Sequence, residues 1–248
     1  MKIGLIGCDD VPERFQALAG TYRSMFESLL RPHLPDAEFT WFDARHGELP
    51  ESPDACDAYL CTGSRHSVYE NRDWIPRLIT FLRAAKGRAR LVGICFGHQA
   101  MAEAFGGHVE KSEKGWGVGL QAYPIVQHEP WMDNVPLVSA PASHQDQVVQ
   151  PPPEADVIAS SVFTPYAGFA WRDQPAISFQ FHPEMSPDFA RALGERGIPG
   201  EDARKITVMF ETITQIALQF TAITVAFTVV LMIVAYTVLA ERRVLGFI

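Results

Sequence analysis

Short apolar runs alternate with stretches of helical periodicity over the first half of the chain. The runs are KIGLIG, AEFTWFD, DAYLCTG and ARLVGIC, at residues 2–7, 37–43, 57–63 and 89–95. Apolar positions recurring three and four residues apart predict helices over residues 14–34 and 74–87. This alternation is typical of a parallel sheet covered by helices, and it predicts an α/β fold.

After Gly106 the pattern changes to short apolar runs separated by proline, glycine and aspartate turns. We expect these runs to form the strands of the second half of one domain. They lie at residues 107–111, 117–126, 137–140, 147–150, 156–161, 168–172 and 176–181.

The end of the chain is different, because residues 212–240 contain no charged side chain. An uncharged apolar stretch of this length can cross a hydrocarbon core of ~30 Å, so it predicts a transmembrane helix. A fully buried core helix is the alternative. We therefore divide the chain into a domain at residues 1–200, a linker at 201–211, a hydrophobic helix at 212–240 and a basic tail at 241–248.

Charge and cysteine content narrow the class of protein. The formal net charge is −8, whereas a nucleic-acid partner needs clustered Lys and Arg, so we expect no nucleic-acid partner. The four cysteines follow no paired spacing, and the N-terminus has too short an apolar run for a signal peptide. These features predict a cytoplasmic domain, anchored to a membrane if the hydrophobic helix spans one.

The stretch GICFG places Cys95 between two glycines, at the point where an apolar run ends. On a tight turn from strand to helix, a nucleophile is exposed at the carboxyl edge of the sheet, and the glycines fit where a Cβ would clash. The nearby helix N-terminus favours thiolate, the reactive form. A turn of small residues that only packs a helix on a strand is the alternative.

A thiol nucleophile needs a base, and FHPE supplies one at the end of another predicted strand. His182 and Glu184 are two residues apart, so in an extended segment they point the same way and the carboxylate can orient the imidazole. A strand-end histidine beside a solvated glutamate is the alternative. In an α/β-hydrolase the acid precedes the histidine in the sequence, whereas here it follows.

Together, GICFGHQ and FHPE resemble the motifs of the class I, triad-type glutamine amidotransferases over residues 1 to about 193. The resemblance implies a flavodoxin-like α/β fold, and a cysteine that takes the acyl group from glutamine as a thioester and releases ammonia. It implies that Cys95 is the nucleophile, His182 the general base and Glu184 the orienting carboxylate. It also implies that the enzyme needs no cofactor and no metal ion.

The same resemblance extends to the rest of the site. CTGSRHSVYE lies where the family has the glycine-rich turn of the oxyanion hole, which implies backbone donors at Gly63 or Ser64, with Phe96 as the second donor. Ser64 and Arg65 replace the usual second glycine and proline. Gln99 matches a position that contacts the amino-acid end of glutamine, and SHQDQV resembles a pocket-lining SHxDxV segment. His144 and Asp146 are therefore candidate substrate ligands, with a role as ordinary turn residues as the alternative.

The acceptor of the ammonia does not follow from these motifs. The chain has no phosphate-binding glycine loop, so a synthetase activity requires a partner. Stand-alone relatives with similar motifs hydrolyse γ-glutamyl bonds of small peptides by the same chemistry. We rank a glutaminase that supplies ammonia to a synthetase partner first, and a γ-glutamyl peptide hydrolase second.

The tail suggests a third hypothesis. Residues from about 209 to 248 resemble the first transmembrane helix, with the basic turn after it, of the H subunit of bacterial NADH:quinone oxidoreductase. Basic residues before the helix keep the catalytic domain cytoplasmic by the positive-inside rule, whereas this resemblance places the ERR segment there instead. The conflict favours a fusion or a read-through product whose tail is a fragment of a respiratory membrane protein.

Overall fold

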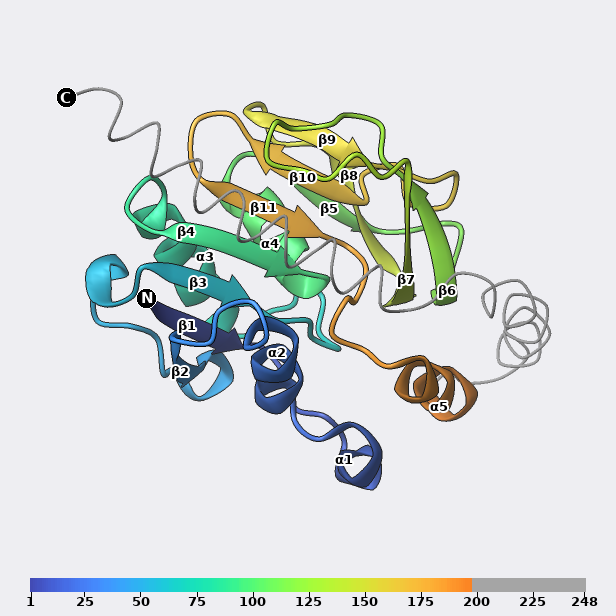
Figure 1. Ribbon diagram of the computed structural model, residues 1–248, viewed down its shortest axis with the longest axis horizontal. Helices are drawn as coiled ribbons and strands as arrows, with labels where there is room; N and C mark the ends of the chain where they lie inside the picture. Colours follow the sequence, from blue (N-terminus) through green and yellow to red (C-terminus); the bar gives the residue numbers. More distant parts are fainter. Residues whose placement is uncertain (198–248) are drawn as a thin grey trace.

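The computed structural model describes residues 1–197, and Figure 1 shows them as a sheet with helices on both faces. The predicted linker, hydrophobic helix and basic tail at residues 201–248 lie outside the described residues. Within residues 1–197, no helix has both the length and the apolar character needed to cross a bilayer.

The central sheet has seven strands in the order β2-β1-β3-β4-β11-β10-β9. The strands β2, β1, β3, β4 and β11 are parallel, and β10 and β9 are antiparallel. In chain order the bounds are β1 Lys2–Gly7, β2 Glu38–Asp43, β3 Ala58–Cys61, β4 Arg90–Ile94, β9 Ala155–Ala159, β10 Gly168–Trp171 and β11 Ala176–Phe179. The first four match the four apolar runs of the first half, so the predicted parallel sheet is confirmed and extended by an antiparallel part.

Within residues 1–197, two antiparallel strand pairs lie beside the central sheet. Five helices complete this part of the chain. The pairs are β5 (His108–Lys111) with β8 (Asp146–Gln150) and β6 (Gly117–Pro124) with β7 (Leu137–His144). The helices are α1 (Glu13–Ala19), α2 (Tyr22–Leu30), α3 (Trp74–Ala85), α4 (Phe96–Ala104) and α5 (Pro187–Gly197), with 3-10 turns at Ala44–His46 and Pro53–Ala55.

The helical periodicity over residues 14–34 is divided between two helices. Gly20 ends α1 with φ 76°, which is the left-handed region that glycine adopts without a steric penalty. Thr21 then caps α2, because its side chain accepts from the Ser24 backbone N–H. The apolar pattern continues through the break, and the glycine and the cap decide the structure.

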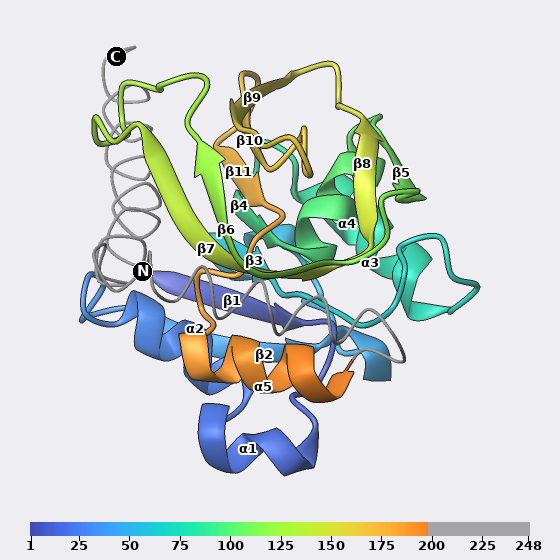
Figure 2. The same cartoon turned by 90° about the vertical axis from the view of Figure 1, so that its right-hand side faces the viewer.

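Side chains on the two faces of the sheet enter separate cores. Cys61 and Leu91 face the core that α3 and α4 cover, whereas Leu60 and Val92 face the core under α2 and the β6–β7 pair. This alternation is the period of two expected of strands buried on both faces. In Figure 2, α5 lies beside α1, and Phe15 and Phe189 make an edge-to-face contact with ring centroids 6.0 Å apart.

The carboxyl ends of the parallel strands meet at one edge of the sheet. Ile6 of β1 is paired with Cys61 of β3, Cys61 with Gly93 of β4, and Ile94 with Phe179 of β11. The segments that follow these strands are therefore neighbours in space although they are far apart in the sequence. They begin at Cys8, Thr62, Cys95 and Gln180.

The first turn of α4 packs directly on the backbone of β3. A Cβ added at Gly97 would lie 2.2 Å from the Cys61 carbonyl oxygen, which is too close for any side chain. We predict that Gly97→Ala destabilises the protein by more than 2 kcal/mol (on the order of the cost of core overpacking), although alanine favours helices over glycine by ~1 kcal/mol. Urea unfolding would measure the change.

Gly87→Ala is the matched control. Gly87 has φ 72°, and a Cβ added there would have no atom within 4 Å, so alanine should cost only about 1–2 kcal/mol of backbone strain. If Gly97→Ala were neutral or stabilising relative to this control, the close contact between α4 and β3 would be wrong.

Candidate active site

Cys95 is the corner between β4 and α4, with φ 52° and ψ −104°. Among the non-glycine residues of 1–197, it alone has a positive φ. A backbone of this kind costs roughly 1–3 kcal/mol and persists only where the surroundings enforce it. A Cβ at Gly93 would lie 2.6 Å from the Gly97 carbonyl oxygen, so the glycines on both sides are required sterically. The residue itself is 4% exposed.

His182 follows β11 and is held by two contacts. Its backbone N–H donates to the Pro141 carbonyl of β7 at 2.8 Å, and its Nδ1 lies 2.8 Å from Glu184 Oε1. Because a carboxylate only accepts, the proton between them belongs to Nδ1. His182 Nε2 has no hydrogen-bond partner among the described residues. The structure thus brings the predicted histidine and glutamate together as a buried pair and leaves the other ring nitrogen for a further contact.

The loop after β3 lies against both the cysteine and the histidine. A Cβ at Gly63 would lie 2.9 Å from His182 Cε1 and 3.5 Å from Cys95 Cβ. Glycine is therefore the residue that allows His182 and Cys95 to approach this loop from two sides. The predicted oxyanion donors Gly63, Ser64 and Phe96 lie within this group, since Phe96 is the first residue of α4.

The charges of the site act on the ionisation of His182. Burial alone would lower the pKa of the ring, but the Glu184 carboxylate and the charge of a Cys95 thiolate raise it, to about 10. The imidazolium form is thus the stable form at neutral pH.

The other predicted residues converge on the backbone carbonyl of Asp146. Gln99 Nε2 donates to that oxygen at 2.9 Å and to Gln180 Oε1 at 3.1 Å. His144 Nδ1 donates to the same carbonyl at 3.2 Å, and the Asp146 carboxylate accepts from the Tyr69 hydroxyl at 2.9 Å. These contacts fix the segment between β7 and β8 against α4, so a structural role is already evident for each of the three residues.

A cavity of about 400 Å³ opens over the cysteine and the histidine. This is within the usual size of small-molecule sites. Of the predicted residues, those that line it are Ser64, Cys95, Gln99, His144, Asp146 and His182. Glu184 lies behind His182 and does not line the cavity.

Sequence reasoning missed one wall of this cavity. Its residues come from the segment after β1, from α1 and α2, and from the far end of the chain that the structure describes. They are Asp9, Asp10, Pro12, Arg14, Tyr22, Met185 and Leu193, with Arg65 beside them. The acidic pair that ends the first apolar run was the available signal, but no local spacing connects it to Cys95.

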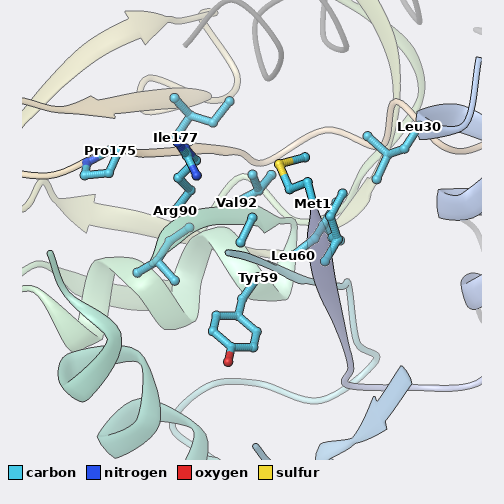
Figure 3. A pocket seen from close by; sticks show the side chains of 11 residues that line it. Met1, Leu30, Tyr59, Leu60, Arg90, Val92, Pro175 and Ile177 are labelled. Carbon is cyan, nitrogen blue, oxygen red and sulfur yellow. The ribbon is translucent and has the colours of Figure 1, made fainter. Parts of the chain in front are cut away.

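A second, smaller pocket lies at the opposite edge of the sheet. Figure 3 shows its lining at the beginnings of β1, β3, β4 and β11, including Met1, Leu60 and Ile177. Its volume is about 30 Å³, which is room for only one or two water molecules. The residues of the predicted site lie at the other ends of these strands. Among residues 1–197, no group of three His, Cys, Asp or Glu side chains could hold a metal ion.

Three buried histidines predict a stability maximum near pH 6.5. Burial, more than any other cause, lowers the pKa of His98 to about 3 and that of His144 to about 4. Both rings bind protons in the unfolded chain at a higher pH than in the folded one, so stability falls as the pH drops below ~6.5. From pH 6.5 to 5.0 we expect a loss on the order of 2 kcal/mol for each ring. Urea unfolding at several pH values would measure it.

The contribution of His182 to the free energy of unfolding depends on pH with the opposite sign, because the pKa of this ring is raised to about 10. Its contribution is complete below ~6.5 and is lost as the pH rises toward 10. His98→Asn is the control for the loss of stability at acidic pH. Whatever the free energy of unfolding of this variant at pH 6.5, the loss between pH 6.5 and 5.0 should be about half of that in the wild type. A wild-type free energy of unfolding that stays constant over this range would contradict the assignment.

Two curated proteins are similar in sequence to this chain. Gamma-glutamyl peptidase 4 of Arabidopsis thaliana is 29% identical over 190 residues, which cover 73% of this chain and 74% of that protein. The A subunit of the glutamine-hydrolyzing GMP synthase of Methanopyrus kandleri is 36% identical over 124 residues, or 44% of this chain and 64% of that protein.

A solved glutamine amidotransferase from Thermotoga maritima has the same fold, with a TM-score of 0.69 at 17% identity and coverage of 95% of this chain and 97% of that one. The family model described as glutamine amidotransferase class-I matches residues 38–192, a range that contains Cys95, His182 and Glu184. Because this match spans more than half of the sequence, the chain belongs to the class-I glutamine amidotransferase family.

Proposed function

We propose that the chain cleaves the amide bond of a γ-glutamyl group through a thioester on Cys95. The observation that carries the proposal is the buried contact of 2.8 Å between His182 Nδ1 and Glu184 Oε1, next to a cysteine on a left-handed corner. The contact leaves Nε2 of the same ring without a described partner. In this proposal, Cys95 is the nucleophile, His182 the base and then the acid, and Glu184 the carboxylate that orients the ring.

The proposed reaction needs only these side chains, the substrate and one water molecule. In the resting state the proton of the Cys95 thiol already resides on the His182 ring, and the Cys95 thiolate attacks the γ-carbonyl carbon. The C–N bond then breaks, and His182 Nε2 gives its proton to the departing nitrogen. In the second half, the neutral ring takes a proton from water as the oxygen attacks the thioester, and cleavage of the C–S bond restores thiolate and imidazolium. The products are the amine and a γ-carboxylate.

Each half passes through an oxyanion that needs donors. The Phe96 N–H at the start of α4 is one donor in this proposal, and the loop of Gly63 and Ser64 supplies the other. A single donor of this kind is worth roughly 3 kcal/mol in the transition state. The remaining candidate ligands, Gln99, His144 and Asp146, shape the pocket wall around the acyl group.

The leaving group is an amine or ammonia. The gamma-glutamyl peptidase 4 match covers about three quarters of both chains, whereas the GMP synthase match covers 44% of this one. The cavity also continues past Cys95 to a wall at Arg14 and Tyr22, which leaves room for a leaving group larger than ammonia. Both observations favour a γ-glutamyl peptide as substrate. The second candidate is a glutaminase that supplies ammonia to a synthetase partner.

The nucleophile can be identified by labelling. We predict that a glutamine-like electrophile modifies Cys95 and leaves the other three cysteines largely unmodified, because Cys8 and Cys61 are at most 1% exposed and none of the three lies beside the His182 pair. Peptide mapping by mass spectrometry would show the site. Cys95→Ala should lower γ-glutamyl hydrolysis by at least about 10³-fold with an unchanged unfolding midpoint.

Equal labelling of all four cysteines, or turnover that survives Cys95→Ala, would refute this assignment. Cys56→Ala is the matched control, since Cys56 is also buried but lies before β3, away from the cavity. It should leave both labelling and turnover as in the wild type.

The two leaving groups are separated by a direct comparison of substrates. We expect the full chain to have a kcat/KM for a γ-glutamyl dipeptide at least about 10-fold above that for free glutamine, a difference of ~1.4 kcal/mol in transition-state binding. Amino-acid analysis of the products against a Cys95→Ala blank would measure both. A preference for glutamine would reverse the order of the two candidates.

A further inference from the structure

The loop from Thr62 to Arg65 is anchored at both ends, and only its middle faces the reactive residues. Gly63 lies against His182 and Cys95, because a Cβ added at Gly63 would be 2.9 Å from His182 Cε1 and 3.5 Å from Cys95 Cβ. Ser64 lines the cavity. Neither the Ser64 N–H nor the Phe96 N–H has a hydrogen-bond partner among the described residues. Two unsatisfied N–H groups beside a cysteine are suited to a developing negative charge.

The first anchor is the hydroxyl group of Thr62, which is fully buried. It accepts from the Cys8 backbone N–H at 3.0 Å and donates to the Gly63 carbonyl at 3.1 Å. The Gly63 carbonyl and the Ser64 N–H belong to one planar peptide and point in opposite directions. By holding that carbonyl, the hydroxyl therefore also fixes the direction of the Ser64 N–H.

The neighbouring peptide is fixed the other way. The Thr62 carbonyl accepts from Gly97 N–H of α4 at 3.1 Å, so it points toward the helix that begins beside Cys95. The Gly63 N–H shares a peptide plane with this carbonyl and therefore points away from α4. Of the two candidate donors in the loop, Ser64 is the one left to face the reaction.

The second anchor is Asp9, which is 4% exposed. Its Oδ2 accepts from the Arg65 backbone N–H at 2.8 Å, and the Arg65 Nε donates to the same oxygen at 2.8 Å. Arg45 adds a second cation, with Nη1 3.6 Å from Asp9 Oδ1. A buried carboxylate with charged partners binds a backbone N–H more strongly than a neutral acceptor does, so this anchor is stiff.

We infer that Thr62 and Asp9 are positioning residues that hold the Gly63–Ser64 peptide, so that the Ser64 N–H and the Phe96 N–H together form the oxyanion hole. The inference rests on the proposed function. Thr62 acts through the Gly63 carbonyl, and Asp9 acts through the backbone of Arg65. Thr62 does not line the cavity, and both residues act on the backbone of the loop before the substrate arrives.

The test uses Thr62→Val, which keeps the shape of the side chain and removes the hydroxyl, with Thr62→Ser as the conservative control. We expect Thr62→Val to lower kcat for γ-glutamyl p-nitroanilide by roughly 10²-fold, the usual effect of losing one oxyanion donor. Thr62→Ser should keep most of the turnover. Alkylation of Cys95 by iodoacetamide forms no oxyanion, so its rate should change less than about 3-fold in either variant.

A second pair of variants tests the other anchor. Asp9→Ala removes the acceptor of the Arg65 N–H, whereas Arg65→Ala removes the guanidinium and keeps that N–H. If Asp9 holds the backbone, Asp9→Ala should lower kcat by about 10-fold or more beyond the effect of Arg65→Ala. Thermal midpoints recorded alongside would show whether each variant is folded.

Different results would refute the proposed function and the positioning role of Thr62 and Asp9. Wild-type turnover no higher than that of Cys95→Ala would refute the proposed function and this inference with it. Wild-type turnover that Thr62→Val leaves unchanged, or equal losses in Asp9→Ala and Arg65→Ala, would refute the inference alone. A parallel fall in turnover and in Cys95 alkylation would also overturn it, because the loop would then act on the thiolate and not on the oxyanion.

Discussion

The backbone of β3 and the first turn of α4 meet at Gly97, and this contact determines the geometry of the whole site. The Gly97 N–H donates to the Thr62 carbonyl at 3.1 Å, and the Cys61 carbonyl oxygen lies too close for any side chain at Gly97. The helix start lies against β3, and β4 enters it through Cys95, whose φ is positive at 52°. The same bond orients the Thr62–Gly63 peptide, so one contact links the start of α4, next to Cys95, to the loop beside it.

Two buried carboxylates at this edge of the sheet are each paired with a cation but have different effects on the site. An isolated buried carboxylate is costly, and each of these has a cation beside it. The Glu184 side chain is fully buried and contacts the His182 ring, so its charge raises the pKa of that ring. Asp9 contacts Arg65 through both a backbone and a side-chain donor, so its charge holds a loop. Similar electrostatics therefore serve ring ionisation at one position and backbone geometry at the other.

The sequence predicts those parts of the fold and the site that depend on local patterns. The four apolar runs of the first half form strands, as expected of short apolar segments between turns. Cys95 is a candidate from the sequence alone because Gly93 and Gly97 lie two residues away on either side. The break at Gly20 was missed because the apolar pattern continues through it. The anchor between Asp9 and Arg65 could not be predicted, since it joins residues 56 positions apart that meet only because β1 and β3 are paired.

The predicted catalytic residues and much of this cavity wall come from different parts of the chain. The family match begins at residue 38 and includes Cys95 and His182, whereas Asp9, Arg14 and Tyr22 precede it. Burial, together with the negative charges of Asp9, Glu184 and a Cys95 thiolate, raises the pKa of Tyr22. The side chain therefore stays a neutral phenol, whose hydroxyl group can donate a hydrogen bond to a polar group in the cavity. The wall is formed where α1 and α2 pack against α5, around Phe15, Met25 and Phe189. Under the proposed function, this wall bounds the space left for the leaving group, and part of it comes from the first 37 residues, outside the segment that the family model matches.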